Sequence, residues 1–288
     1  MSIRGTTRRP GDYPLPRENE TIRKKVLRIG TKQSILLVIY ESPKTINLRM
    51  GGHDKWCIDC DLIKDTGNTV KPRGYLSAIR YDMACSLEHT FVKGKDTKEL
   101  VKLLVQYIHD TYPAVKELSF NDCSTRTCDD NVDVNLAVMT YLYSEQTWYE
   151  KTFGAYILPE YETEWANIKT RYNHAKHDIG WDDMKEIIKN DERITKMSDG
   201  DMEELYKKSE SWKEFFEGIY RTIHIDKFCI FVSTWLNRFI VQYFNTLCGV
   251  KFAIPIKDQG IQYTESEYKR GGKRHSRKAT RKHAKDYH

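Results

Sequence analysis

The sequence predicts an α+β protein in which a mixed, mostly antiparallel sheet with packing helices is followed by a helical C-terminal half. Three observations predict this class. Apolar or alternating segments separated by turn residues fill residues 35–91, which is typical of antiparallel strands. The apolar period then changes to helix, strand and helix over residues 97–154. From residue 160 to residue 249 the apolar residues recur mainly at helical spacing.

Charge is segregated along the chain. The 288 residues carry a net charge of +6, but residues 1–32 alone carry +6 and residues 269–288 carry +8, so that the body between them is acidic, at −8. An acidic body is not a surface that attracts nucleic acid. We therefore expect any contact with nucleic acid to be made by the two basic ends.

Cysteine usage and hydropathy bear on location. Seven cysteines, an odd number scattered over a long chain, predict no disulfide framework and a reducing compartment. The first residues form no apolar leader, and no run of about 18 apolar residues is present. The sequence thus predicts an intracellular protein without a membrane span.

The first domain is expected to cover residues 33–158. Before it, residues 1–32 are expected to form a disordered basic arm, since prolines lie among the arginines. The strands expected in the first half of the domain are 35–40, 47–50, 56–63, 75–81 and 84–91.

The second half of this domain alternates helix and strand. Apolar residues share one face of a helix over residues 97–112, which Asp96 or Thr97 caps and Pro113 ends. A strand over 115–120 and a polar loop over 121–130 follow. A second helix is expected from about residue 132 to residue 149, stopping near Gly154.

A mainly helical region, packed on the first domain, is expected over residues 159–264. It is predicted to contain helices at 181–189, 201–208, 212–221 and 225–248, and a final strand at 252–256. Pro255 restricts this strand to an edge or to an end of a strand, since proline cannot donate to the ladder. Residues 265–288 are expected to be a disordered basic tail.

One stretch carries a family resemblance. Residues 87–157 are expected to run strand, loop, helix, strand, helix, and to end in Tyr149-Glu150-Lys151-Thr152-Phe153-Gly154. This order and motif resemble the cofactor-binding half of the GNAT superfamily of acyl-CoA-dependent acyltransferases, over roughly residues 75–157. The resemblance implies a GNAT-like domain, acetyl-CoA or another acyl-CoA as cofactor, an amine as acceptor and N-acyltransferase activity.

The resemblance places the cofactor pyrophosphate before the 97–112 helix, because the N-terminus of a helix attracts anions. The cofactor-binding candidates are Lys93, Gly94, Lys95, Thr97 and Asn135. The sequence departs from the family pattern here, with a single glycine and with the carboxylate of Asp96 where a small residue belongs. The alternative interpretation is a basic turn that Asp96 caps and that binds no cofactor.

The resemblance also assigns catalytic roles. Tyr149 is the candidate acid that protonates the departing thiolate, and Glu88, on the expected strand before the loop, is the candidate base. His89 is adjacent and must face the opposite side of a strand. The alternative is that Trp148, Tyr149 and Phe153 only pack the helix end into the core and that Glu88 is a solvated charge. An open slot between parallel strands at 88–92 and 118–120 would favour catalysis.

Metal binding is not expected. Cys57 and Cys60 have a zinc-like spacing, but positions i and i+3 of a strand face opposite sides. Cys123 and Cys128 are the alternative second pair for a four-cysteine site. His174, His177 and Asp178 share one helix face without a further ligand, which is more typical of a surface.

The basic tail predicts a polyanionic partner. It carries cations without apolar residues to bury, so that phosphate groups of nucleic acid are its expected contact. The candidate phosphate-binding residues are Lys269, Arg270, Lys273, Arg274, Arg277, Lys278, Arg281 and Lys282. The alternatives are a localisation signal or a contribution to solubility.

The composition is also similar to that of proteins from large nucleocytoplasmic DNA viruses. The similarity lies in the Gly271-Gly272-Lys273-Arg274 tail, in the abundance of Tyr, Lys, Asp and Asn, and in the helix end at residues 147–151. It implies a location in the host cytoplasm or nucleus, or in the virion. The second functional hypothesis is therefore a non-catalytic GNAT-like domain in a virus-encoded binding or virion-associated protein whose tails contact nucleic acid.

Overall fold

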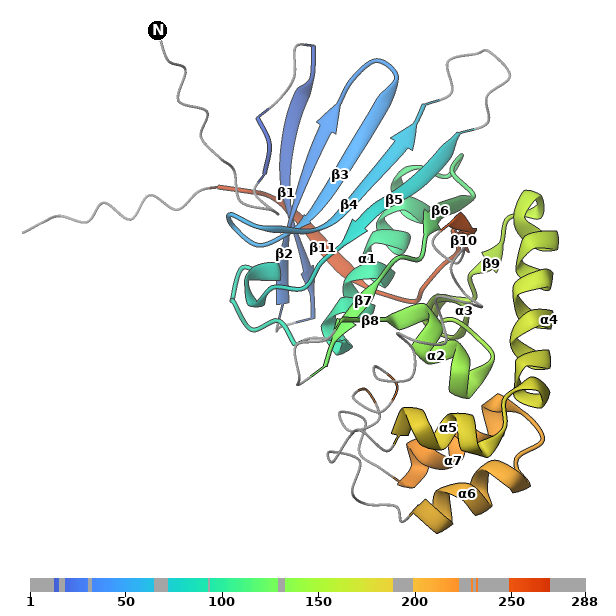
Figure 1. Cartoon of the computed structure of the whole chain (residues 1–288). Helices are drawn as coiled ribbons and strands as arrows, with labels where there is room; N and C mark the ends of the chain where they lie inside the picture. The colour runs from blue at the N-terminus through green and yellow to red at the C-terminus, as the bar shows by residue number, and fades with distance from the viewer. Residues whose placement is uncertain are drawn as a thin grey trace, which may run out of the picture.

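The computed structural model describes residues 13–15, 19–30, 33–64, 72–92, 94–128, 133–188, 199–222, 229, 232 and 249–269. Within them one nine-stranded sheet has the order β11-β1-β2-β3-β4-β5-β6-β10-β9, and β7 and β8 form a separate two-stranded sheet (Figure 1). In the large sheet β5 and β6 are parallel, and the other neighbouring strands are antiparallel. The predictions of an α+β class and of a mixed, mostly antiparallel sheet are confirmed.

The strands of the large sheet are β1 (Thr21–Ile29), β2 (Gln33–Glu41), β3 (Thr45–Gly51), β4 (Trp56–Ile63), β5 (Arg73–Ile79), β6 (Glu117–Asn121), β9 (Tyr156–Ile157), β10 (Lys251–Pro255) and β11 (Tyr263–Glu267). The small sheet consists of β7 (Thr125–Thr127) and β8 (Asp133–Asn135). The expected strands in the ranges 35–63, 75–81, 115–120 and 252–256 match β2 to β6 and β10 within a few residues.

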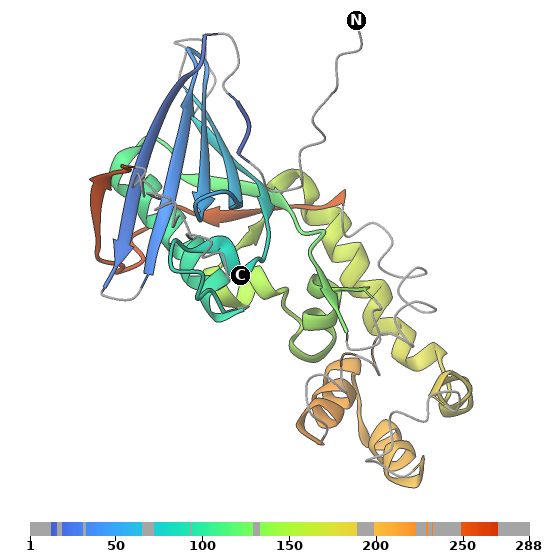
Figure 2. The same cartoon turned by 90° about the vertical axis from the view of Figure 1, so that its left-hand side faces the viewer.

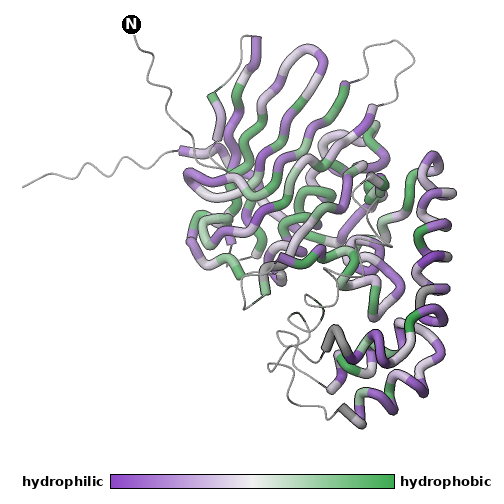
Figure 3. The backbone as a smooth tube through the Cα atoms, in the orientation of Figure 1, coloured by the Kyte–Doolittle hydropathy of each residue, from purple (hydrophilic) through white to green (hydrophobic). Residues whose placement is uncertain are grey.

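Strand β2, the third strand of the sheet, is apolar on both faces. Its alternate residues Ile35, Leu37 and Ile39 belong to the main core, whereas those between them face the other side of the sheet. There Leu36, Val38 and Tyr40 form a second cluster, which we call the outer cluster. A strand buried on both faces reads as a continuous apolar run, as the sequence of β2 does. In Figure 3 hydrophobic and hydrophilic stretches alternate along the strands of the large sheet.

Helix α1 (Lys95–Thr111) connects the parallel strands β5 and β6. Its expected apolar face is fully buried and joins the main core, as the amphipathic pattern predicted. The helix begins two residues before the expected start, and its N-cap is Gly94, at φ +82°, rather than Asp96 or Thr97. Glycine suits this position because it adopts positive φ without strain.

The expected helix over 132–149 is interrupted. It consists of α2 (Leu136–Ser144) and α3 (Trp148–Phe153), because Glu145 adopts the left-handed conformation at φ +57° and ends α2. The Thr147 hydroxyl then accepts a hydrogen bond from the Glu150 amide, and the Glu150 carboxylate accepts one from the Thr147 amide. This capping box starts a new helix. The motif that resembled a helix end is thus a complete short helix, which Gly154 closes at φ +64°.

The expected helical region is described over residues 162–222, which lie in the middle of the chain. Its helices are α4 (Glu162–Asp178), α5 (Trp181–Ile188), α6 (Asp199–Lys208) and α7 (Trp212–Thr222), and α7 packs against α2. In both views they lie away from strands β1 to β4 (Figures 1 and 2). The expected helix over 225–248 lies outside the described residues, except for Cys229 and Val232, which are both buried. None of the helices in the described part of the chain is long and apolar enough to cross a membrane.

Three expectations about the sheet were wrong. Residues 21–29 are not part of a disordered arm but form β1, which pairs with β2 along its whole length. Residues 263–267 form the edge strand β11, which pairs with β1 although it follows more than 230 residues later. The residues 84–91 form no strand and instead contain a short 3-10 turn at Met83–Cys85. The expectation for Pro255 is confirmed, since β10 lies inside the sheet and Pro255 stands at its end.

The cysteine expectation was also wrong. Disulfides link Cys57 to Cys85 and Cys128 to Cys229, each with a Cα–Cα distance of 5.7 Å. The first ties β4 to the 3-10 turn. The alternative zinc site fails because Cys57 and Cys128 belong to different disulfides. Among the described residues no group of three or more His, Cys, Asp or Glu side chains is arranged to hold a metal ion.

The parallel pair depends on the absence of a side chain at Gly74. A Cβ atom there would lie 2.2 Å from Cδ2 of Leu118 and 3.2 Å from the carbonyl oxygen of Glu117. Leu118 is fully buried and has no space to move into. We predict that Gly74→Ala lowers the free energy of unfolding by about 1–3 kcal/mol, as measured by urea denaturation. The matched control is Gly249→Ala, where a Cβ meets no atom within 4 Å. An equal loss for both variants would contradict close packing at Gly74.

Candidate active site

The parallel strands β5 and β6 separate soon after they meet. Their ladder consists of Gly74 opposite Leu118 and Tyr75 opposite Ser119, while β5 continues to Ile79 and β6 to Asn121. A cavity of about 190 Å³ lies where they diverge. One wall is the β5 segment 76–79, the other is the segment 120–124, and Tyr149 of α3 completes the lining. Ligands of open α/β sheets commonly bind at such carboxyl ends of parallel strands.

Asp122 directly follows β6 and is the acidic group of this cavity. Only 1% of its surface is exposed. Its Oδ1 accepts hydrogen bonds from the Ser124 hydroxyl at 2.5 Å and from the Ser124 amide at 3.3 Å. Its Oδ2 is buried and has no hydrogen-bond partner in the described part of the chain. A buried carboxylate oxygen without a partner is uncommon and calls for an explanation.

The environment of Asp122 raises its pKa. Burial is the largest cause and brings the pKa to about 6, against the lowering effect of the hydrogen bonds from Ser124 and with a further increase from the charge of Glu150. The group is therefore mostly ionised at neutral pH, yet its proton affinity is higher than that of an ordinary aspartate. A base with a pKa near the working pH is well suited to accept a proton.

Tyr149 is the second titratable group of the cavity. Its ring packs against Phe120 of β6, with a centroid distance of 4.4 Å, and 6% of the residue is exposed. Burial raises the pKa of its hydroxyl above the usual value, and the negative charge of Asp122 raises it further. Tyr149 consequently stays protonated at neutral pH and is a hydrogen-bond or proton donor. The capping box of α3 fixes its position.

The candidate base Glu88 lies elsewhere. It is in the irregular segment after the 3-10 turn, and its carboxylate accepts a hydrogen bond from the Ser34 amide at 2.9 Å. The neighbouring His89 has a positive φ of 56° and is exposed. The expected slot at 88–92 does not exist because the parallel partner of β6 is β5. Asp122 was missed by the sequence analysis, although an acid directly after a buried strand is a recognisable signal.

Trp148 and Phe153 do not fill the slot. Both rings contact Tyr149, at centroid distances of 4.9 and 6.0 Å, and Phe153 is buried. The residues found to line the cavity in the described structure include Tyr149 but neither of these two. The alternative interpretation expected Trp148, Tyr149 and Phe153 to pack together, and these three rings do contact one another. The cavity that Tyr149 lines is nevertheless not filled by Trp148 or Phe153.

The expected cofactor loop is only partly suited to an anion. Gly94 precedes α1, and the next residue, Lys95, is exposed. Asp96 is buried, however, and its carboxylate accepts a hydrogen bond from the Val92 amide at 2.6 Å. This agrees with the alternative in which Asp96 stabilises a turn. Thr97 is half-buried.

Of the two remaining cofactor candidates, only Asn135 is described. Asn135 is the N-cap of α2, where its side chain accepts a hydrogen bond from the Val138 amide at 3.0 Å. Lys93 lies outside the described residues. Of the tail candidates, Lys269 is described and exposed, and those from Arg270 onward are outside the described residues.

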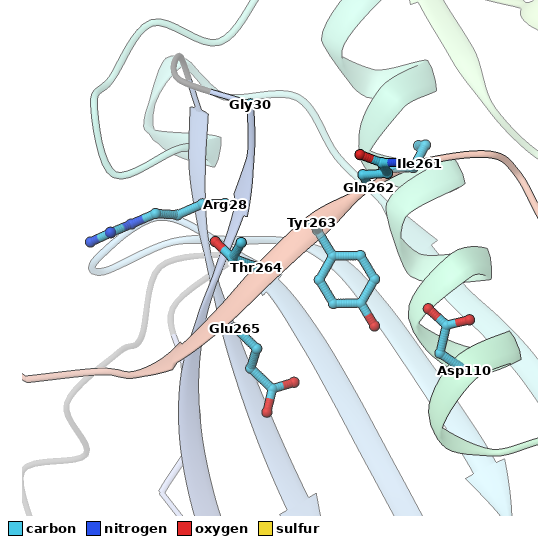
Figure 4. Close-up of a pocket in the computed structure, with 8 residues that line it drawn as sticks. All are labelled: Arg28, Gly30, Asp110, Ile261, Gln262, Tyr263, Thr264 and Glu265. Atoms are coloured by element: carbon cyan, nitrogen blue, oxygen red, sulfur yellow. The ribbon is translucent and has the colours of Figure 1, made fainter.

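A larger cavity lies beside the edge strand, where Tyr263 of β11 and Asp110 of α1 are close neighbours (Figure 4). Asp110 accepts a hydrogen bond from Nε2 of Gln106 at 3.0 Å, and Oε1 of Gln106 accepts one from the Gln259 amide at 2.7 Å. This network attaches the β10–β11 connection to α1. On α4, His174 and His177 line an open hollow together with Thr170 and Asn173.

Comparison with protein-family models, with curated proteins and with solved structures finds no match for this chain.

We expect the ionisation of Asp122 to lower the free energy of unfolding. Its pKa is higher in the folded than in the unfolded chain, so that the folded state binds more protons and stability falls as pH rises from about 4 to about 6. We predict that Asp122→Asn is more stable than the wild type at pH 7.5, by about 2–3 kcal/mol, and that the difference shrinks towards pH 4. Urea denaturation across this pH range measures it.

The matched control is Asp182→Asn at an exposed position. Its effect is expected to stay within about 0.5 kcal/mol at every pH, as for most surface changes. A variant Asp122→Asn that is less stable than the wild type at pH 7.5 would contradict a buried carboxylate without a partner for Oδ2.

Proposed function

We propose that this chain is a GNAT-like, acyl-CoA-dependent N-acyltransferase in which Asp122 is the proton acceptor and Tyr149 the proton donor. The observation that carries the proposal is the pairing of these groups in one cavity. A buried carboxylate with an unpartnered oxygen and a raised pKa lines the same space as a phenol that stays protonated. Two titratable groups whose environments give them opposite roles at one pH are typical of acid–base catalysis.

The sheet supports the GNAT-like part of the proposal. The resemblance implies a pair of parallel strands that diverge, and the β5-α1-β6 unit contains such a pair, formed by β5 and β6 rather than by residues 88–92 and 118–120. Beyond the Tyr75–Ser119 pair, no further β5–β6 ladder pair is present in the described residues. We infer that an amide-containing ligand such as the pantetheine arm binds between the two strands beyond this pair.

The size of the cavity limits what it encloses. Sites that enclose a drug-sized ligand are typically about 300–1,000 Å³, whereas this cavity has about 190 Å³. It accommodates the reacting end of a thioester and an amine, and the remainder of the coenzyme would lie outside it. An acyl-CoA, when bound, supplies the activated acyl group.

The chain contributes two proton transfers. The ionised carboxylate of Asp122 accepts a proton from the attacking amine, while Ser124 holds its Oδ1 in place. The hydroxyl of Tyr149 donates a proton to the departing sulfur. Phe120 and the residues of α3 exclude water from this side of the cavity.

A non-catalytic binding role is the second candidate function. The observation that favours it is the carboxylate of Asp96, which places a negative charge in the first turn of α1 and uses the Val92 amide. Such a charge opposes phosphate binding at this helix N-terminus. In this case the domain would present its basic ends without performing acyl transfer.

Activity is tested with the full chain, acetyl-CoA and a mixture of primary amines, with acetylated products detected by mass spectrometry in about 0.3 M salt to screen the basic ends. We predict acetyl transfer by the wild type and a loss of about 10²–10⁴-fold in kcat for Asp122→Asn, the range expected for a general base. Glu88→Gln is the matched control and is expected to keep wild-type activity. Equal activity of all three proteins, or none in the wild type with millimolar acetyl-CoA, would contradict the proposal.

The pH dependence gives an independent prediction. Because Asp122 must be ionised to accept a proton, kcat/KM should rise with pH and level off above about 6. Tyr149→Phe removes the hydroxyl that is proposed to donate the proton. We expect this variant to have a lower kcat, while its kcat/KM still rises with pH because Asp122 is unchanged. A rate that does not change between pH 5 and pH 8 would exclude Asp122 as the base.

A further inference from the structure

We propose that the amine acceptor carries two amino groups, and that Asp61 and Tyr75 bind the second one, as an ammonium, while the first reacts in the cavity. This inference rests on the proposed acyl transfer and names its substrate class. Asp61 of β4 and Tyr75 of β5 are directly opposite each other in the antiparallel ladder. Directly opposite side chains share one face of a sheet and lie close together. A carboxylate and an aromatic ring are therefore neighbours on this face.

The cavity between the diverging strands extends to the same face of the sheet. Of its lining residues, Phe120 and Tyr149 belong to the main core on the inner side. Ser77 follows the core residue Leu76 in β5, so that its exposed side chain points to the opposite, outer side. Asn121 follows Phe120 in β6 and is on the outer side for the same reason. Ser77 and Asn121 thus form the outer rim of the cavity.

Both members of the Asp61–Tyr75 pair are connected to this rim. The Ser77 hydroxyl donates a hydrogen bond to Oδ2 of Asp61 at 2.9 Å. The Tyr75 hydroxyl lies 3.5 Å from Oδ1 of Asn121. A second hydrogen bond, from Nδ2 of Asn47 at 2.8 Å, holds Oδ1 of Asp61. The carboxylate and the ring are thus positioned at the outer mouth of the cavity.

The charge of Asp61 has no counterion in the part of the chain that the structure describes. The neighbouring Asp59, which Asn47 also contacts, is in contrast paired with Arg49 at 2.9 Å. An ionised carboxylate has about four acceptor positions. After the hydrogen bonds from Asn47 and Ser77, Asp61 therefore keeps acceptor capacity for a cationic ligand.

The surroundings favour a substrate that carries a positive charge. No basic side chain is among the described residues that line the cavity, and Asp122 adds a negative charge at its inner end. The ring of Tyr75 is 38% exposed. An ammonium is attracted to the face of such a ring as well as to a carboxylate. The second amino group of the acceptor thus meets two groups that stabilise its protonated form.

The separation of the two acids determines the length of the acceptor. Asp61 is opposite Tyr75, Tyr75 is opposite Ser119, and Ser119 precedes Asp122 by three residues. Two strand spacings across the sheet and three residues along it correspond to about 14 Å between the Cα atoms of Asp61 and Asp122. Both side chains extend towards the cavity and shorten this distance. The expected acceptor is therefore a long diamine or a polyamine.

The test compares 1,8-diaminooctane with octylamine, which lacks only the second amino group. With the full chain and saturating acetyl-CoA, we predict a kcat/KM at least about tenfold higher for the diamine, after allowance for its two reactive ends, as for a hydrogen bond to a charged group. The short 1,3-diaminopropane cannot reach both acids and should have no such advantage over propylamine. Calorimetry without acetyl-CoA measures the binding of 1,8-diaminooctane and octylamine separately from acyl transfer.

The role of the two side chains is tested by substitution. Asp61→Asn should abolish the preference for 1,8-diaminooctane while kcat/KM for octylamine stays at the wild-type value, which also shows that the variant is folded. Tyr75→Leu should reduce the preference about threefold, and Tyr75→Phe should retain it. Asp182→Asn removes an exposed charge on α5 and is the matched control, which should keep the full preference.

An active wild type that uses 1,8-diaminooctane and octylamine equally would overturn the inference. Full preference for the diamine in Asp61→Asn would overturn it as well. If the wild type acetylates neither compound, the proposed function fails, and the calorimetry still decides on the ammonium site. Tighter binding of the diamine that Asp61→Asn abolishes would support the site, and equal affinity for the two compounds would exclude it.

Discussion

The close approach of β5 and β6 at Gly74 is the constraint on which the rest of the structure depends. At this point two parallel strands pair over two residues and then separate, because Gly74 lets the buried Leu118 pack against its backbone. Parallel strands need a long connection, which α1 provides, and α1 in turn covers the core side of the sheet. The short ladder leaves a cavity at the strand ends, and Asp122 and Tyr149 are among the titratable groups that line it.

The two faces of the sheet have different roles. The inner face packs against α1, α2 and the aromatic residues of the C-terminal helices, and the candidate active site lies at the edge of this core. On the outer face a small cluster around Tyr40 receives Tyr13 and Tyr268. Because Ile39 and Tyr40 are adjacent in β2 yet face opposite sides, one strand supports both the core and the contacts of Tyr13 and Tyr268.

Local patterns in the sequence were sufficient for much of the fold. The apolar run of β2 and the helical spacing in α1 and α7 predicted these elements because burial determines them locally. Strand β11 could not be predicted in this way, since Thr264 and Glu265 are exposed and its pairing with β1 is a long-range backbone interaction. Strand β1 was not predicted either, because the sequence before residue 33 is rich in charged residues.

The candidate site was predicted in part. Tyr149 was identified from its motif and does line the cavity, although the motif forms a separate capped helix. Glu88 was chosen because residues 84–91 were expected to be the strand before α1. The strand before α1 is instead β5, so that the expected base lies away from the cavity. Asp122 was passed over as part of a polar loop. Its burial and raised pKa follow from the separation of β5 and β6, which only the three-dimensional arrangement reveals.

The most direct test of the central claim is to follow the ¹³C resonance of the Asp122 carboxyl group during a pH titration, with Asp122→Asn used to assign it. The structure predicts a pKa of about 6. It also predicts a shift of the resonance in Tyr149→Phe, since both side chains line one cavity. A pKa near 4, the ordinary value for a solvated aspartate, together with no response to Tyr149→Phe, would contradict an enclosed acid–base pair between the diverging strands.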